Sequence, residues 1–215
     1  MMRFHGYFRS SSAYRCRIAF NLKGLDYEFA PVPLKDGAQR GAAYTALNPQ
    51  ALVPSLEIGE GEVLIQSLAI LEWLEESHPE PAILGRDPLT RAKERGFAQV
   101  IACEVHPLQN LRVLNYLTGT LGAGEEQKAA WLTHWLRAGL ETCEALLARR
   151  GEKTPFCYGD APGLADICLV PQVFSARRFG VDISDLTHVL AVDAECARHD
   201  AFVRAHPENQ PDFAA

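Results

Sequence analysis

The sequence predicts an α/β domain followed by an all-helical domain. Strand-like and helix-like segments alternate over residues 1–80, and beyond Leu89 no segment of any length has the pattern of a strand. Between the two patterns, three prolines and Gly85 interrupt the chain after His78, a composition typical of a linker. We therefore expect an N-terminal domain at residues 1–80 and a C-terminal helical bundle at residues 88–215.

The N-terminal domain is expected in the order β-α-β-α-β-β-α. Apolar and aromatic segments predict strands at residues 3–8, 27–32, 52–58 and 63–65, the last two joined by a glycine-marked turn. Helical spacing predicts helices at residues 12–23, within 35–46 and at 68–76, and Gly24 can close the first of them. In that first helix we expect Arg15 and Arg17 to face outward.

The C-terminal domain is expected to hold four helices. They are predicted at residues 91–117, 129–149, 164–179 and 189–205. Pro107 is expected to kink the first of these, and Pro171 lies inside the third.

Composition limits the classes of function. The net charge of −6 argues against general nucleic-acid binding, which needs a basic surface. The six cysteines form no CxxC pair and no Cys/His cluster, so we expect free thiols and no metal site. No apolar run reaches the ~18 residues of a membrane span. No secretory leader opens the chain, so we expect a cytoplasmic protein.

Ser10, Ser11 and Ser12 lie where the first strand passes into the first helix. Unpaired backbone N–H groups and the positive end of the helix dipole can hold an anion at such a place. A thiolate is an anion, and a helix N-terminus lowers the pKa of a thiol. Serine is also a favoured N-cap, so helix capping alone explains one of the three.

Two further segments could face the same ligand. A cis Val53–Pro54 bond would turn the Val53 backbone towards an extended peptide, although an ordinary proline that opens a strand explains the dipeptide equally well. Gln66 and Ser67 begin the next helix, where Ser67 is a natural N-cap and a carboxylate could bind. Together these features suit a small peptide-like ligand that carries a thiol and carboxylates.

This combination resembles the zeta-class glutathione transferases, which include maleylacetoacetate and maleylpyruvate isomerases. The segments that carry the resemblance are residues 8–19 (FRSSSAYRCRIA), 47–54 (LNPQALVP), 66–76 (QSLAILEWLEE), 106–111 (HPLQNL), 169–173 (LVPQV) with Arg178 and Phe179, and 210–212 (QPD). The likeness covers nearly the whole chain at the same spacing. It implies a thioredoxin-like domain followed by a helical domain, with glutathione as cofactor.

The resemblance also implies roles for individual residues. Ser10 matches the serine whose hydroxyl donates to the glutathione sulfur, and Ser11 and Ser12 would add contacts nearby. Gln50 and Val53 would hold the glycyl and cysteinyl backbone, and Gln66 and Ser67 the γ-glutamyl carboxylate, while Glu104 and His106 could reach a partner's glutathione across a homodimer interface. A histidine inside a helix is more often structural.

Two departures from the family pattern stand out. The zeta motif commonly reads Ser-Ser-Cys, whereas this chain has Ser12 at the third position, which leaves the proposed activating hydroxyl in place. Gly163 stands where Thr or Ser usually lies three residues before Asp166, which weakens a capping box.

The implied reaction is the cis–trans isomerisation of a conjugated diacid in the catabolism of aromatic compounds. A thiolate that adds to the alkene leaves a single bond free to rotate, and its elimination restores the trans alkene. Such a site needs cations for the carboxylates and for the charge that develops, and Arg9, Arg112 and Arg178 are the candidates. Glu104, Leu108 and Arg112 are expected on one helix face.

The arginines favour maleylpyruvate over maleylacetoacetate, because zeta enzymes that act on the latter often lack the arginine matching Arg112. Each arginine could also be an ordinary surface charge. A general glutathione transferase or dehalogenase, and a non-enzymatic interaction protein with the same fold, are the alternatives.

Overall fold

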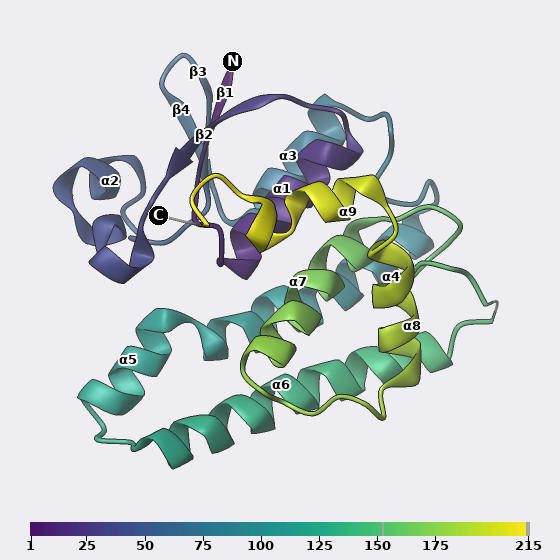
Figure 1. Cartoon of the computed structure of the whole chain (residues 1–215). Helices are drawn as coiled ribbons and strands as arrows, with labels where there is room; N and C mark the ends of the chain where they lie inside the picture. Colours follow the sequence, from purple (N-terminus) through teal and green to yellow (C-terminus); the bar gives the residue numbers. More distant parts are fainter. Residues whose placement is uncertain (152, 214–215) are drawn as a thin grey trace. The chain divides into compact units, whose positions relative to one another are not determined.

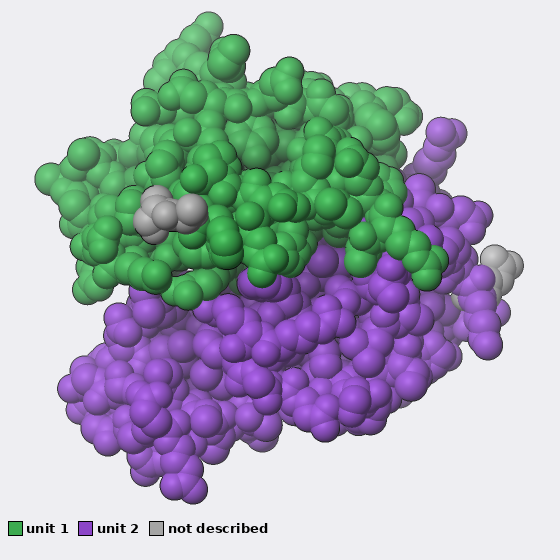
Figure 2. Space-filling view, in the orientation of Figure 1, with its two compact units in different colours: residues 1–83, 197–215 green, residues 84–196 purple. Residues whose placement is uncertain are grey.

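The computed structural model describes residues 1–151 and 153–213 of the 215-residue chain. It contains two compact units, one made of Met1–Ile83 with Ala197–Ala215 and the other of Leu84–Cys196 (Figure 2). The first unit holds a four-stranded sheet, and the strands that the structure describes all lie there (Figure 1). The expected fold class, an α/β unit together with a helical unit, is confirmed.

The sheet has the strand order β2-β1-β3-β4. Its strands are β1 (Met2–Gly6), β2 (Tyr27–Pro31), β3 (Ser55–Gly59) and β4 (Glu62–Ile65). Strand β1 pairs with β2 in parallel and with β3 in antiparallel orientation, and β3 and β4 form the expected hairpin. Strand β3 begins after Pro54 because proline has no N–H to donate to the ladder.

The helices of the first unit are α1 (Ser11–Leu22), α2 (Ala42–Leu47), α3 (Ser67–Ser77) and α9 (Asp200–Ala205), with 3-10 turns η1 (Leu34–Asp36), η2 (Ala38–Arg40) and η5 (Pro207–Asn209). Helices α1 and α3 pack against each other on one side of the sheet, and α2 lies on the other (Figure 1). The expected helices therefore all form, within one or two residues of their predicted ends.

The outward placement of Arg15 and Arg17 was wrong. Both arginines are buried, as is every residue of α1 from Ser11 to Phe20. Helix α1 packs against α3 and α9, so it has no outer face over this stretch. The composition of α1 gave no sign of this, because serines and arginines alternate with its apolar residues.

The C-terminal segment groups with the first unit, which differs from the expected division at residues 1–80 and 88–215. Helix α9 packs on α1, and Asn21 donates through Nδ2 to the Ala201 carbonyl at 2.9 Å. In Figure 1 the yellow end of the chain accordingly lies beside the purple start of α1. Sequence order suggested a helical C-terminus that belonged with its neighbours, whereas side-chain packing assigns it to the sheet unit.

The helices of the second unit are α4 (Pro88–Gln99), the π-helix η3 (Val100–Val105), the 3-10 helix η4 (His106–Gln109), α5 (Leu111–Gly119), α6 (Glu125–Ala148), α7 (Leu164–Arg178) and α8 (Thr187–Cys196). Two predictions need correction here. The helix expected at residues 91–117 is broken rather than kinked, since Asn110 is extended, with ψ 143, and caps α5. The helix expected at residues 189–205 is two helices, separated at an extended His199.

The buried Asp166 carboxylate of the second unit is hydrogen-bonded by backbone groups nearby in the sequence. The Asp166 carboxylate accepts from the Gly163 N–H at 2.9 Å and from the Cys157 N–H at 2.8 Å, so half of the weakened capping box survives at the start of α7. The six cysteines all lie in the described part of the chain and form no disulfide there, and Cys103 is the exposed one among them. Among the residues that the structure describes, no helix has the length and apolar character needed to cross a membrane.

Candidate active site

Ser10 is the N-cap of α1. Its backbone is extended, with φ −73 and ψ 119, and its Oγ accepts from the Ala13 N–H at 3.3 Å. The capping interpretation is thus correct for this serine. An N-cap oxygen accepts a hydrogen bond and leaves the hydroxyl proton for another partner, so capping does not conflict with a role towards a ligand.

Hydrogen-bond donors and acceptors distinguish the three serines. The Ser12 hydroxyl donates to the Val53 carbonyl at 3.0 Å, and Ser12 Oγ lies 3.0 Å from Ser10 Oγ. Because a hydroxyl has one proton, Ser10 is the donor between the two serines in this arrangement. Ser11 and Ser12 are buried and Ser10 is partly exposed. The Ser10 proton is therefore the one that can turn towards an incoming anion.

Val53 lies next to this serine pair because it comes just before β3, which pairs with β1. The Val53–Pro54 bond is cis, one of the two possibilities that the sequence left open. The Val53 carbonyl, expected to face a peptide ligand, already accepts one hydrogen bond from Ser12. A carbonyl oxygen can accept two, so this contact leaves a second lone pair.

Gln50 and Gln66 are also brought together. Gln66 Nε2 donates to Gln50 Oε1 at 2.7 Å, and both side chains are exposed. Gln66 has a positive φ of 71 and is the N-cap residue of α3, so Ser67 is the first helical residue rather than the N-cap expected. A non-glycine residue held in this backbone region is uncommon and is often found at functional sites.

Arg15 is a residue of this region that the sequence analysis did not identify as functional. Its Nη1 donates to Ser67 Oγ at 3.2 Å from within the buried part of α1. A guanidinium therefore lies beneath the N-terminus of α3, where the helix dipole is also positive. This combination of charges favours a carboxylate at Ser67.

Arg9, in the first unit, is partly exposed, and its Cζ lies 5.8 Å from the centroid of the Phe8 ring. The other remaining candidates belong to the second unit. Glu104 is exposed on the π-helix η3, and His106 is the first residue of η4. Arg112 is exposed on α5, and Arg178 is exposed at the end of α7 with its Cζ 4.2 Å from the centroid of the Phe179 ring. The expected common face of Glu104, Leu108 and Arg112 does not exist, because these residues lie in three different helices.

Metal-binding residues do not gather in the described part of the chain, where no group of three His, Cys, Asp or Glu side chains could hold an ion. The chemistry available is that of hydroxyls, amides, arginines and two helix N-termini. Such a set can bind an anionic peptide and lower the pKa of its thiol.

Comparison with known proteins identifies the family of this chain. The N-terminal domain of the glutathione S-transferases matches residues 9–77, and their C-terminal domain matches residues 125–199. The chain is 50% identical to a maleylacetoacetate isomerase of Pseudomonas aeruginosa, with 100% of both chains covered. The chain belongs to the glutathione S-transferase family, in its zeta class of maleylacetoacetate and maleylpyruvate isomerases.

Two solved structures are similar to this chain over nearly its whole length. A holo maleylpyruvate isomerase, described as a bacterial zeta-class transferase, is 47% identical with a TM-score of 0.95, covering 98% of this chain and 99% of that one. A maleylacetoacetate isomerase of Anaeromyxobacter dehalogenans is 40% identical with a TM-score of 0.88, covering 99% and 94%. That structure holds dicarboxyethyl glutathione and citrate in its active site.

Proposed function

We propose that this protein is a glutathione-dependent cis–trans isomerase of maleylacetoacetate- or maleylpyruvate-type diacids, acting in the cytoplasm in aromatic catabolism. The relatives with these names and their bound ligands support the reaction class. Dicarboxyethyl glutathione is what a glutathione thiol forms by adding to an unsaturated dicarboxylate, which is the first half of the proposed reaction. The free cysteines suit a reducing compartment.

The donor set of the first unit fits glutathione. The thiol of glutathione would lie at Ser10 and the N-terminus of α1. Its γ-glutamyl carboxylate would lie at Ser67, next to Arg15 and the N-terminus of α3. Gln50, Gln66 and the Val53 backbone would hold the peptide between them. Ser11 and Ser12 would support these contacts from buried positions.

Bound glutathione supplies a thiolate that adds to the alkene, allows rotation about the resulting single bond, and is then eliminated. Ser10 stabilises the ionised sulfur by donating its hydroxyl proton, while Ser12 keeps its own proton on the Val53 carbonyl. Arg9, Arg112 and Arg178 bind the substrate carboxylates and the charge that develops on the carbonyl oxygens. Glu104 and His106 contact glutathione of a second copy in a homodimer.

The hydrogen-bond chain from Ser10 through Ser12 to Val53 carries this proposal, and it sets the test. Ser10→Ala removes the only hydroxyl of the pair that can turn to the sulfur, so we expect kcat to fall by about 10²–10³-fold, with a much smaller change in the Kd for glutathione. Ser12→Ala should cost less, because it removes only a support.

The measurement is an absorbance assay of maleylpyruvate and maleylacetoacetate, each with and without glutathione. Ser77→Ala, at an exposed serine whose hydroxyl bonds its own helix at Trp73, is the matched control. Equal turnover by Ser10→Ala and the unmodified protein would refute the role of Ser10. Conjugation of neutral electrophiles without isomerisation of either diacid would indicate a general transferase instead.

A further inference from the structure

The connection between β1 and α1 is held by side chains rather than by the sheet. The Phe8 N–H donates to Asp212 Oδ2 at 2.8 Å, across 204 positions of sequence. The Phe8 carbonyl accepts from Arg17 Nη2 at 2.9 Å, and the Tyr7 carbonyl accepts from the Ser10 N–H at 3.0 Å. Both hydrogen-bonding groups of the Phe8 backbone are thus bound by ionisable side chains, two residues before Ser10.

Both of these side chains are buried. Arg17 is 0% exposed and Asp212 8% exposed. Arg17 Nε also donates to the Ala205 carbonyl at 3.0 Å, so the same guanidinium joins the β1–α1 connection to the C-terminal segment. Burial lowers the pKa of Arg17 to about 10, and Asp212 is among the groups that oppose this shift. Burying charge is costly, so this arrangement calls for an explanation beyond anchoring the tail.

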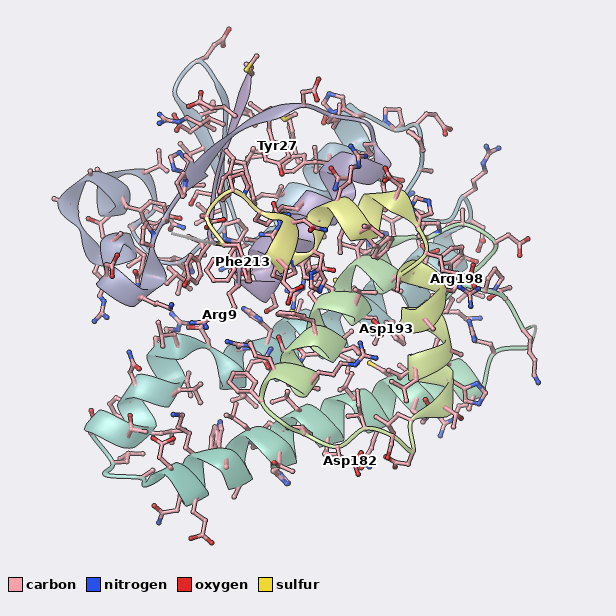
Figure 3. The ribbon with its side chains drawn as sticks, in the orientation of Figure 1. Arg9, Tyr27, Asp182, Asp193, Arg198 and Phe213 are labelled. Atoms are coloured by element: carbon pink, nitrogen blue, oxygen red, sulfur yellow. The ribbon has the colours of Figure 1, made fainter. Side chains whose placement is uncertain are left out.

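Aromatic contacts also join the C-terminal segment to the β1–α1 connection. The Phe213 ring meets the Phe8 ring edge-on, with centroids 5.5 Å apart, and the Arg9 guanidinium lies 5.8 Å from the centroid of the same ring. Arg9 and Phe213 are both labelled in Figure 3. The C-terminal segment therefore contacts Phe8, which lies directly before the proposed substrate arginine Arg9 and two residues before the proposed activating serine Ser10.

We infer that Asp212 is a positioning residue, which fixes the Phe8 backbone and through it places the Ser10 hydroxyl and the Arg9 side chain. This inference rests on the proposed function for its consequence in catalysis, but not for the geometry. One Asp212 oxygen holds the Phe8 N–H, and Oδ1 is buried with no hydrogen-bond partner among the described residues. A tail that served only as a cover would not need a buried carboxylate at this place.

The test compares Asp212→Ala and Asp212→Asn with Glu208→Gln, a matched change at an exposed acid of the same segment. A displacement of a reacting group by about 1 Å can lower a rate by roughly 10²-fold. We therefore expect Asp212→Ala to lower kcat by up to that factor and to leave the KM for glutathione unchanged. The thiol pKa of bound glutathione, read from thiolate absorbance, should rise. Asn keeps an acceptor oxygen for Phe8, so Asp212→Asn should recover part of the loss.

Amide hydrogen exchange of the unliganded protein tests the geometry without any activity. Asp212→Ala should speed exchange at the Phe8 and Ser10 N–H groups and leave Ile18, in the buried middle of α1, unchanged. Unchanged exchange at Phe8, or equal acceleration at Phe8 and Ile18 in both Asp212 variants, would overturn the inference. If the unmodified protein isomerises neither diacid, the proposed function fails, whereas faster exchange confined to Phe8 and Ser10 still supports the positioning role.

Discussion

At the scale of single residues, the role of a side chain depends more on the direction of its hydrogen bonds than on its residue type. Three consecutive serines look equivalent in the sequence, yet one caps α1 and remains partly exposed while the other two are buried. The carbonyl of Val53 commits the Ser12 proton and so leaves the Ser10 proton available. In the same way, Arg15 and Arg17 looked like surface charges, but their neighbours in space make them internal donors.

Arg137 and Asp185 provide a test of electrostatics at this scale. Hydrogen bonds from Arg137 lower the pKa of Asp185 to about 2, from 3.8. A carboxylate whose pKa is lower in the folded state stabilises it above the unfolded pKa, and this contribution is lost as the pH falls from 3.8 through about 2. We therefore expect Arg137→Ala to raise the pKa of Asp185 and to make the protein less sensitive to acid in this window.

Carboxyl-carbon NMR titration measures this change directly. Asp182 is the internal control, since its pKa is lowered chiefly by the Ser184 backbone N–H and should stay low in Arg137→Ala. An Asp185 pKa that remained near 2 in the variant would assign the shift to another cause.

At the scale of elements, the break between α4 and α5 is the feature that positions the second set of candidates. Glu104 lies in a π-helix and His106 in a 3-10 helix, both short and less favourable than an α-helix, and Arg112 follows in α5. The π-helix packs on α6, where Gly139 faces Val105. A Cβ at residue 139 would lie 2.0 Å from Val105 Cγ2, so this glycine permits the close approach of η3 to α6.

Gly139→Ala should therefore destabilise the protein, although alanine is the better helix former. Overpacking of this kind costs about 1–3 kcal/mol of unfolding free energy. Gly96→Ala is the matched control, because it lies in α4 with nothing within 4 Å of the added Cβ. We expect this control to stabilise the protein by about 0.4–1 kcal/mol.

Urea unfolding of the two variants, and of Gly139→Ala combined with Val105→Ala, checks the cause. The double variant should regain part of the loss, since it removes the two methyl groups that the new Cβ meets. Equal stabilisation by both glycine replacements would show that the contact of η3 with α6 is not close.

At the scale of the whole molecule, the thiols are divided between interior and surface. Five of the six cysteines are buried, and Cys103 on η3 is exposed. Burial raises the pKa of Cys143 to about 12, and it raises the pKa of Cys157 and of Cys196 as well. Buried neutral thiols react slowly because the thiolate is the nucleophile.

We accordingly expect one thiol of the native chain to react rapidly with a chromogenic disulfide, and six in denaturant. Cys103→Ser should abolish the rapid reaction, whereas Cys143→Ser should leave it unchanged. Rapid labelling of two or more thiols in the native protein would contradict this division of the cysteines.

The fold class could be read from the sequence alone, and the residues of the site remain predictions from it. Periodicity and turn residues located the strands and the helices of the first unit, because those signals are local. The resemblance named five glutathione-binding candidates: Ser10, Gln50, Val53, Gln66 and Ser67. Of these, the structure links Ser10 to Val53 through Ser12 and joins Gln50 to Gln66 by a hydrogen bond. The contacts of Arg17 and Asp212 with Phe8, and the grouping of the C-terminal segment with the sheet unit, became visible only in the folded chain. The reason is physical: hydrogen bonds between residues as distant as 8 and 212 depend on the packing of α1 and α9, which no local pattern encodes.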